Sequence, residues 1–586
     1  MQLCGENLMK QHINDLICKS INTIDAEQSI DAAILSRIKV ERCKDRAHGD
    51  FACNAAMILA KSLKKSPRDV AAALIASIPS NDRISKVEIA GPGFINFFVN
   101  QDFIAKNLEA MGADPRLGVK ICPQKENVVV DYSAPNVAKE MAVHHIRSTV
   151  IGDAVVRVLE FLGHNVIRAN HIGDWGTQFG MLIAYLEKAE NEQGSGMDLS
   201  DFEAFYRMAK KCYDDDPVFA EKARNYVVKL QGGDPYCRKM WKKLVNMTME
   251  QNQKLYDRLD VTLTDKDIMG ESLYNDMLPV IVQDLIDRKI AVEDNGAIVV
   301  FLPQFKNKEG QPLGNIIRKS DGGYLYTTTD IACIKYRVDT LHANRILYFT
   351  DSRQQQHHEI TWAICRKAGY VPESVSLEHC PFGMMLGKNG KPFKTRSGDT
   401  VKLRDLLDEA ENRVTQMLLD RGSNLEDQDR ANVIHNIAIG AVKYADLSKN
   451  RNTDYIFDWD LMLSFEGNTA PYLQYAYSRI RSIFRKATIQ PGHIVISDSA
   501  EEELAGKLLA FPEAVESVAV KSMPNLLCNY LYELSNLFMR FYEQCPILKD
   551  GVDPSIQQSR LALCDLTSKV LKQGLGLLGI NVMEQM

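Results

Sequence analysis

Apolar and polar positions change their spacing sharply between residues 126 and 162. The three valines at 128–130 form a β-branched run bounded by charged residues, which is typical of a buried parallel strand. Pro135 follows, and apolar residues then recur at helical spacing as far as Leu162. The pattern predicts a strand, a polar loop and a helix whose first N–H groups could bind a phosphate or carboxylate. Because most such units in α/β domains bind nothing, a purely structural role stays open.

The same succession returns at residues 165–188. Residues 165–169 predict a second strand, and Gly173, Gly176 and Gly180 mark the loop before the next helix. Two such units in a row predict a doubly wound parallel sheet of the Rossmann type, with a ligand beyond the carboxyl ends of its strands. The charged, helical pattern at about 190–290 predicts an insertion. Later apolar segments predict the strands that complete the sheet, at 297–302, 323–329, 345–350 and just before Met385.

Two further domains flank this predicted sheet. Residues 1–105 predict a separate α/β module, in which helical patterns precede apolar alternation around a Gly-Pro-Gly turn. These helical patterns cover residues 9–21, 51–63 and 69–78. Residues 106–125 contain several glycines and prolines and predict a linker. The fold class is therefore α/β, with an N-terminal module, a parallel sheet over 126–399 and a C-terminal all-α bundle, free of strands, over 400–586.

Composition narrows the class of protein. A length of 586 residues exceeds what one core usually serves, and no apolar run is long enough to span a bilayer. The N-terminus lacks the features of a signal peptide, and the 13 cysteines show no C-x-x-C spacing. We therefore expect a cytoplasmic protein with reduced, mostly buried thiols and no membrane partner. The net charge of -6 excludes only a basic coat, because phosphate binding needs local clusters of Lys and Arg.

The pair Tyr326 and Asp330 is a candidate for ligand binding. Their spacing places both side chains on one face in a strand or in a helix, and a carboxylate beside a phenol could hold a planar guanidinium. The alternative, that Asp330 caps the helix that follows, is equally compatible with the sequence. The loop at 386–400 has three glycines and four basic residues, which predicts a mobile cationic flap.

Histidine pairs and a loop serine also suggest chemistry. The neighbours His144 and His145, like His357 and His358, could suggest a metal site. Adjacent side chains on a helix diverge, however, and no third ligand stands at metal spacing, so we expect no metal. Ser133 has no partner for nucleophilic attack and is better interpreted as a loop residue that forms hydrogen bonds.

Two groups of aromatic residues could either belong to the core or form a contact surface. Tyr472, Tyr475 and Arg479 share one stripe of a predicted helix, as stacking on unpaired bases would require. Such a stripe is usually core with a solvated basic rim. The phenylalanines of residues 94–98 likewise favour a core role when the strand is considered alone.

Several motifs, taken in order, resemble one family. They are SAPNVAKEMAVHHIRSTVIGDA, IRANHIGDWGTQFG, DGGYLYTTTDIA, GKPFKTRSG and NTAPYLQYAYSR, preceded by GPGFINFF in the N-terminal module. Together they closely resemble the bacterial arginyl-tRNA synthetases over nearly the whole chain. The resemblance implies a class I synthetase that uses ATP, with Mg²⁺, to form arginyl-adenylate and then transfers arginine to the terminal adenosine of tRNA(Arg). Family enzymes need bound tRNA even for the first step. We expect a monomer. We also expect no editing domain, because other amino acids would leave polar groups of a guanidinium pocket unpaired.

The resemblance also assigns roles to individual residues. The arginine site would comprise Asp131, Ser133 and Asn136 at the α-amino and carboxylate end, and Tyr326, Asp330 and Gln354 at the guanidinium end. The ATP site would comprise Lys139, Ala142, His144 and His145. The flap resembles the family's KMSKS loop, and the catalytic cations would be Lys139, His145, Lys391, Lys394 and Arg396. In the N-terminal module the residues that match contacts with the tRNA D-loop are Phe94 and Asn96. In the C-terminal bundle the residues that match anticodon contacts are Tyr472, Tyr475 and Arg479.

The start of the first predicted helix departs from the family signature. Where the family has His-x-Gly-His, this chain has Ala142 in the first position and His144 in the third, and only His145 survives. The HIGD sequence at His171 lies in the next unit and is not the signature. Losing one charge-assisted hydrogen bond weakens a phosphate contact by about 1.5–3 kcal/mol. Either His144 or Lys139 substitutes for it, or activity is impaired. The rival hypotheses are a silent tRNA-binding protein and a class I synthetase for another amino acid.

Overall fold

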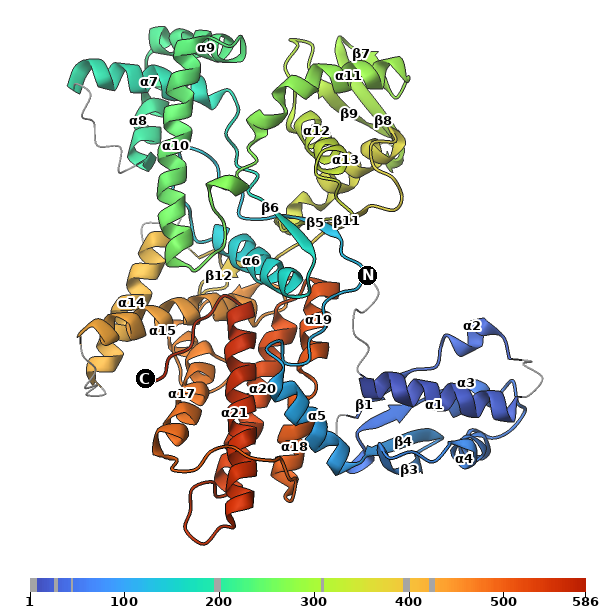
Figure 1. The fold of residues 1–586 in the computed structure, drawn as a ribbon. Coiled ribbons are helices and arrows are strands. Elements are labelled where there is room, and N and C mark those ends of the chain that lie inside the picture. The colour runs from blue at the N-terminus through green and yellow to red at the C-terminus, as the bar shows by residue number, and fades with distance from the viewer. Residues whose placement is uncertain are drawn as a thin grey trace.

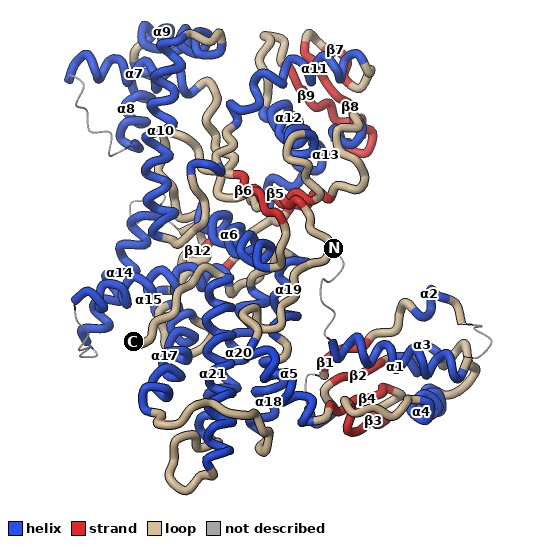
Figure 2. Tube along the Cα trace, viewed as in Figure 1, coloured by secondary structure: helices blue, strands red, loops and turns tan. Residues whose placement is uncertain are grey.

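The computed structural model describes residues 8–25, 30–43, 46–193, 202–306, 310–393, 401–420 and 427–586. Figure 1 shows a small N-terminal module beside a long C-terminal helical bundle, with a central parallel sheet and two further lobes above them. Figure 2 shows that strands gather in the module and in the upper part, while the bundle is mainly helical. Helix α5 (Gln101–Ala113) runs between the module and the bundle.

The N-terminal module is an antiparallel sheet covered by helices. The sheet has the order β1-β2-β4-β3, from β1 (Val40–Arg42), β2 (Phe51–Cys53), β3 (Ile84–Ala90) and β4 (Phe94–Val99). The helices are α1 (Leu8–Ile24), α2 (Ala32–Leu35), η1 (Arg46–His48), α3 (Ala55–Leu59) and α4 (Pro67–Ser77). The helix predicted from residue 51 is wrong at its start, because Phe51 and Cys53 point into the core from a strand. The predicted linker begins as α5, which packs on the bundle.

A parallel sheet lies at the centre of the molecule. Its order is β11-β10-β5-β6, from β5 (Asn127–Asp131), β6 (Asn165–Ala169), β10 (Arg345–Tyr348) and β11 (Ser376–His379). Helix α6 (His145–Phe161) packs on the face of Val128 and Val130. Helices α12 (Tyr326–Asp339) and α13 (Gln355–Lys367) pack on the face of Val129. Because helices cover both faces, all three valines are fully buried, and the predicted doubly wound sheet is confirmed.

Two segments expected to add strands to this sheet do not. Residues 297–302 belong to β8 (Ala297–Lys306), which pairs antiparallel with β7 (Ala291–Asp294) and β9 (Pro312–Arg318) in a separate sheet. Asn295 and Gly296 both have positive φ and form the turn of the β7–β8 hairpin, a signal for antiparallel pairing. Residues 323–329 are not a strand, because α12 begins at Tyr326. The strand-free bundle is also wrong at one point, where β13 (Tyr455–Ile456) pairs with β12 (Met385–Leu386).

The other helices fall into two groups along the chain, one between the strands of the parallel sheet in sequence and one in the bundle. Between the strands of the parallel sheet lie α7 (Gln178–Gln193), α8 (Phe202–Asp215), α9 (Pro217–Gln231), α10 (Pro235–Arg258), η2 (Asp265–Asp267), η3 (Glu271–Met277), α11 (Leu278–Asp287) and η4 (Ser352–Gln354). The bundle contains α14 (Leu403–Asp420), α15 (Asp427–Leu447), α16 (Trp459–Met462), α17 (Ala470–Lys486), α18 (Ser499–Leu508), α19 (Phe511–Lys521), α20 (Asn525–Gln544) and α21 (Pro554–Leu577).

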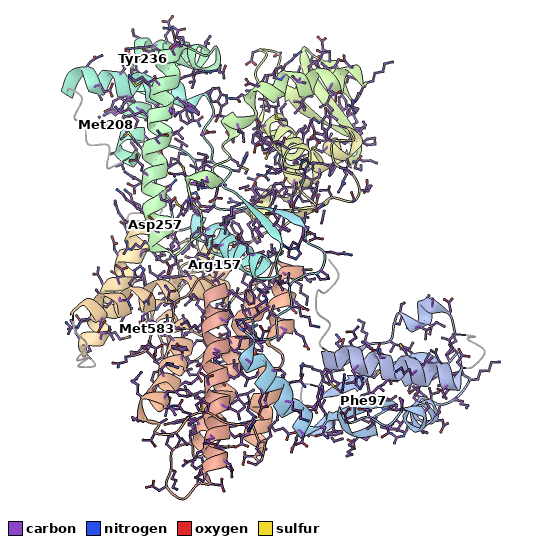
Figure 3. All side chains as sticks on the ribbon, viewed as in Figure 1. Phe97, Arg157, Met208, Tyr236, Asp257 and Met583 are labelled. Carbon is purple, nitrogen blue, oxygen red and sulfur yellow. The ribbon has the colours of Figure 1, made fainter. Side chains whose placement is uncertain are left out.

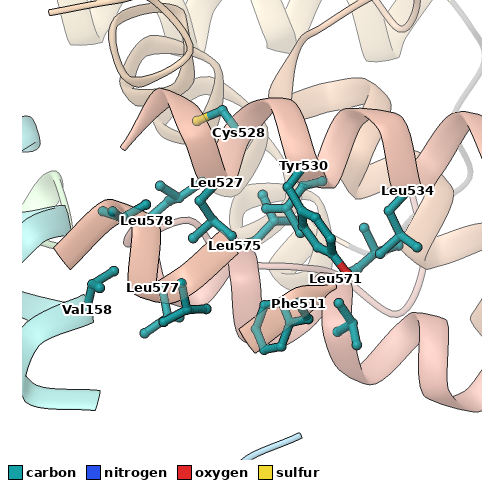
Figure 4. Close-up of a cluster of buried hydrophobic side chains, with 14 of the residues drawn as sticks. Val158, Phe511, Leu527, Cys528, Tyr530, Leu534, Leu571, Leu575, Leu577 and Leu578 are labelled. Atoms are coloured by element: carbon teal, nitrogen blue, oxygen red, sulfur yellow. The ribbon is translucent and has the colours of Figure 1, made fainter. Parts of the chain in front are cut away.

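Helix α6 joins the sheet to the bundle. Figure 4 shows Val158 of α6 next to Leu577 at the end of α21, within one continuous apolar cluster. On another side, Arg157 donates to Asp153 at 2.8 Å and to the carbonyl of Asp260, just after α10, at 2.5 Å. Arg157 lies where the central part meets the bundle (Figure 3). The C-terminal part of α6 is therefore held by contacts with both the bundle and the segment after α10.

Two expectations from composition can be compared with this fold. Within the described ranges, no helix is long and apolar enough to cross a membrane. Eleven of the described cysteines are free, and most of these are buried.

Candidate active site

The two central strands of the parallel sheet lead to helices on opposite faces. Strand β5 continues into α6 and β10 into α13, so the loops after Asp131 and Tyr348 diverge at the carboxyl edge of the sheet. Such a divergence leaves a crevice that binds ligands in doubly wound folds. A cavity of about 1140 Å³ lies at this position, with further walls from α12 and from residues 382–385. This cavity is the candidate active site.

The loop after β5 is held in a conformation that few side chains adopt. Ser133 and Ala134 have φ values of 70° and 47°, in the left-handed region. The Ser133 N–H donates to Ser148 Oγ at 2.9 Å, and Ser148 Oγ donates to the Phe349 carbonyl at 2.7 Å. Ser133 Oγ lies 2.8 Å from the hydroxyl of Tyr256 on α10. Ser133 is thus a hydrogen-bonding loop residue, and the surrounding elements over-determine the strained loop.

Asp131 ends β5 and faces the cavity with one oxygen already bound. Its Oδ2 accepts a hydrogen bond from Nη2 of Arg337 at 2.6 Å, and Arg337 is fully buried. Among the described residues, Nε and Nη1 of Arg337 have no hydrogen-bond partner. Removing Asp131 would leave a buried guanidinium without its counter-ion. The carboxylate therefore stabilises the fold as well as lining the cavity.

Tyr326 and Asp330 lie one turn apart at the start of α12 and both line the cavity. The capping alternative for Asp330 is wrong, because the cap position of this helix is Leu325. Asp330 Oδ2 accepts a hydrogen bond from Nε2 of His357 at 2.5 Å, and Oδ1 lies 3.8 Å from Nε2 of His171. Burial alone would raise the pKa of Asp330, but the His357 hydrogen bond and the nearby histidines lower it below its ordinary value. Asp330 is therefore an ionised acceptor within the cavity.

Glu271 is a second carboxylate of this cavity, which the sequence analysis missed. It lies at the start of η3 and lines the same walls as Asp330. Burial, together with the charges of Asp330 and Asp174, raises the pKa of Glu271 to about 7. Two carboxylates that face one space favour a cationic ligand. No local pattern marks Glu271, because only the fold brings it beside Asp330.

The other end of the cavity is the first turn of α6. Nδ1 of His145 lies 3.0 Å from the amide nitrogen of Ala142, and burial and the neighbouring His144 lower the pKa of His145 to about 4. His144 is the cap residue of α6, and its ring lies 4.1 Å from that of His145. Loss of hydration and the charge of Arg353 also lower the pKa of His144. Both imidazoles are therefore neutral at pH 7 and can offer hydrogen bonds rather than charge.

The remaining predicted residues are distributed unevenly. Gln354 lines the cavity and is exposed. Asn136, Lys139, Ala142 and Lys391 are described but do not line it, and Lys139 instead lies 5.2 Å from the ring of Tyr206 beside a smaller cavity. The other two predicted flap cations, Lys394 and Arg396, lie outside the described residues.

The residues assigned to tRNA contact lie far from this cavity in the sequence and in the fold. In β4, the Phe94 side chain is 38% exposed, whereas Asn96 is buried between β2 and β3. On α17, Tyr475 is 39% exposed, and Nη1 of Arg479 donates to its hydroxyl at 3.2 Å. Tyr472 is half-buried and donates to an amide oxygen of α20 at 2.8 Å. The purely core interpretation is therefore wrong for Phe94 and Tyr475.

Comparison with known proteins agrees with this architecture. Residues 108–459 match the family of tRNA synthetases class I (R), catalytic domain. Residues 473–586 match the DALR anticodon binding domain, and residues 9–99 match the arginyl tRNA synthetase N terminal domain.

Individual relatives cover nearly the full chain. An arginine–tRNA ligase of Haemophilus influenzae is 58% identical over 98% of this chain and 99% of the relative. That of Haemophilus ducreyi is 61% identical over 92% and 96%. The crystal structure of arginyl-tRNA synthetase from Plasmodium falciparum matches with a TM-score of 0.83 and 31% identity, over 99% of both chains. The chain therefore belongs to the class I arginyl-tRNA synthetases.

Proposed function

We propose that this protein activates L-arginine with ATP, with Mg²⁺ bound to the nucleotide, and transfers it to the 3′-terminal adenosine of tRNA(Arg). The observation that carries the proposal is the cavity in which Asp330 and Glu271 lie at one end and the first turn of α6 at the other. Pyrophosphate exchange, measured with each amino acid with and without tRNA, tests it. Arginine-dependent exchange supports the proposal. Exchange with another amino acid, or none under any condition, supports one of the rival hypotheses.

The acidic end of the cavity suits the side chain of arginine. A guanidinium is planar and donates in a fork, so the ionised carboxylate of Asp330 is a matching acceptor. The ring of Tyr326, 65% exposed at the cavity wall, can lie against its hydrocarbon part, and Glu271 can supply a second carboxylate. Lysine would place a compact ammonium where a fork is expected and leave acceptors unpaired. Gln354 would belong to the same guanidinium end, and Asp131, Ser133 and Asn136 would hold the α-amino and carboxylate end of the amino acid.

The other end of the cavity suits the nucleotide. N–H groups at the start of α6, with the imidazoles of His144 and His145, can donate to phosphate oxygens. Lys139 and the flap cations Lys391, Lys394 and Arg396 would contact the phosphates of ATP. The arginine carboxylate attacks the α-phosphate in line, so the protein mainly aligns the reactants and stabilises charge on the leaving pyrophosphate. Mg²⁺ would arrive with the phosphates and share their charge.

The altered signature is best explained as a rebuilt site. Ala142 stands where the family signature has its first histidine, and it does not line the cavity. His144, two residues later, does line the cavity and can supply the missing imidazole. The double variant Ala142→His with His144→Gly restores the family pattern. A loss or no gain in aminoacylation supports rebuilding, and a large gain supports impairment.

We also propose that the three domains have different roles. Residues 1–105 would bind the tRNA D-loop through Phe94, and residues 400–586 would bind the anticodon through Tyr475, which is exposed on α17, and Arg479, which donates to its hydroxyl. The segment 126–399 would carry the chemistry. The protein would act in the cytoplasm as a monomer.

A further inference from the structure

A second cavity, of about 340 Å³, lies where the N-terminal module meets the bundle. Its walls come from the sheet of the module, from α5 and from the corner between α18 and α19. Figure 1 shows α5 running between the module and these two helices. Most of the wall is apolar, and its hydrocarbon side chains include Met9, Phe51, Val99, Phe103, Ile104 and Met111. The volume is at the lower end of the range for sites that bind small organic molecules.

One buried carboxylate in this wall has an oxygen without a hydrogen-bond partner among the described residues. Glu516 of α19 is 3% exposed, and its Oε1 forms no hydrogen bond with any described residue. Burial, and then the charge of Glu513, raise the pKa of Glu516 to about 7, while Lys120 acts in the opposite direction. A buried carboxylate with an unsatisfied oxygen is costly unless a donor binds it. Glu516 therefore retains one carboxylate oxygen that accepts no hydrogen bond from the described residues, and a ligand that donates a hydrogen bond could satisfy it.

Four other charged groups of the cavity, those of Arg42, Asp50, Asp114 and Glu513, already have partners, and Lys120 is the cation that acts on Glu516. The carboxylates of Asp50 and Asp114 accept backbone N–H groups, and Glu513 binds the guanidinium of Arg42 at 3.2 Å. With Glu516, the cavity has four acids against the two bases Arg42 and Lys120. This excess of negative charge favours a cationic ligand over an anionic one.

We propose that this cavity binds a small organic cation, a primary ammonium attached to a short alkyl or aryl group. The ammonium donates to Glu516, and the hydrocarbon part contacts the apolar wall. Because the wall comes from the module, α5 and the bundle, a bound molecule contacts all three and stabilises their association. The inference does not depend on the proposed function.

Titration calorimetry of the full chain with 2-phenylethylammonium at pH 8 tests the proposal. We expect binding of one molecule per chain, and at least tenfold weaker binding of 2-phenylethanol, which lacks the charge. Glu516→Gln should weaken the ammonium at least tenfold. Glu533→Gln, an exposed carboxylate on α20, is the matched control and should leave binding unchanged. Asp330→Asn should also leave it unchanged, which separates this cavity from the acidic end of the candidate active site.

A second variant and a pH series complete the test. Ala110 is exposed at the cavity wall, so Ala110→Trp should fill the space and abolish binding without touching Glu516, even where Glu516→Gln fails to fold. The affinity of the unaltered protein should rise as the pH is raised from 6 to 8, because Glu516 ionises while the ammonium stays protonated. Absence of binding, equal binding of the alcohol, or unchanged affinity in a folded Glu516→Gln or Ala110→Trp variant overturns the proposal.

Discussion

Replacing Asp330 by Asn tests the arginine site with the smallest change of shape. The amide keeps one acceptor oxygen but loses the negative charge that would meet the guanidinium. A charge-assisted hydrogen bond contributes about 1.5–3 kcal/mol, and leaving a charged partner unmatched in a desolvated site can cost about 2–5 kcal/mol. Glu271 remains in the cavity and offsets part of the loss. We therefore expect a loss of about 3 kcal/mol, which is on the order of 10²-fold in kcat/KM for arginine.

The assay is arginine-dependent pyrophosphate exchange in the presence of tRNA, with arginine and ATP varied separately. The KM for ATP should stay nearly constant, because Asp330 lies at the opposite end of the cavity from α6. Asp339→Asn at the exposed end of the same helix, where the carboxylate pairs with Lys335 of the preceding turn, is the matched control. If the variant kept its KM for arginine within twofold, or lost ATP and arginine affinity equally, the assignment of this carboxylate to the guanidinium would be refuted.

Three further predictions concern pH, stability and tRNA. The pKa of Glu271 is raised to about 7, so its charge appears as the pH rises through 7; the KM for arginine should fall over this interval, and Glu271→Gln should remove the pH dependence. Arg147→Met leaves the fully buried Asp446 without its ion-pair partner and should lower the free energy of unfolding by about 3–5 kcal/mol in urea denaturation. The double variant Arg147→Met with Asp446→Leu should recover much of that stability. Equal losses of stability in the single and the double variant would contradict the role of the unpaired buried charge. Tyr475→Ala should weaken tRNA binding by about 1–3 kcal/mol in a filter assay if a base stacks on the exposed ring, and unchanged binding would exclude such stacking.

Local spacing was sufficient for much of the framework. The valine run at 128–130 predicts a strand buried on both faces, and that conclusion needs only the hydrophobic effect and the period of a strand. The spacing of Tyr326 and Asp330 places them on one face whatever the backbone does. The strand expected at 323–329 was wrong, because an apolar and β-branched run does not distinguish a strand from the buried first turns of a helix. The Asn295-Gly296 turn could have shown that the strand at 297–302 pairs antiparallel.

The sequence alone therefore determined the two strand-loop-helix units at 126–162 and 165–188, the doubly wound class and the family, since these depend on periodicity and on motifs in order. Tertiary structure decided which groups share a cavity: it placed Glu271 beside Asp330, gave Asp131 a buried Arg337 as partner, and left Lys139 outside the cavity wall. It also brought Glu516 to a junction with the N-terminal module. These contacts join residues far apart along the chain, and their charges and hydration depend on burial, which no local pattern encodes.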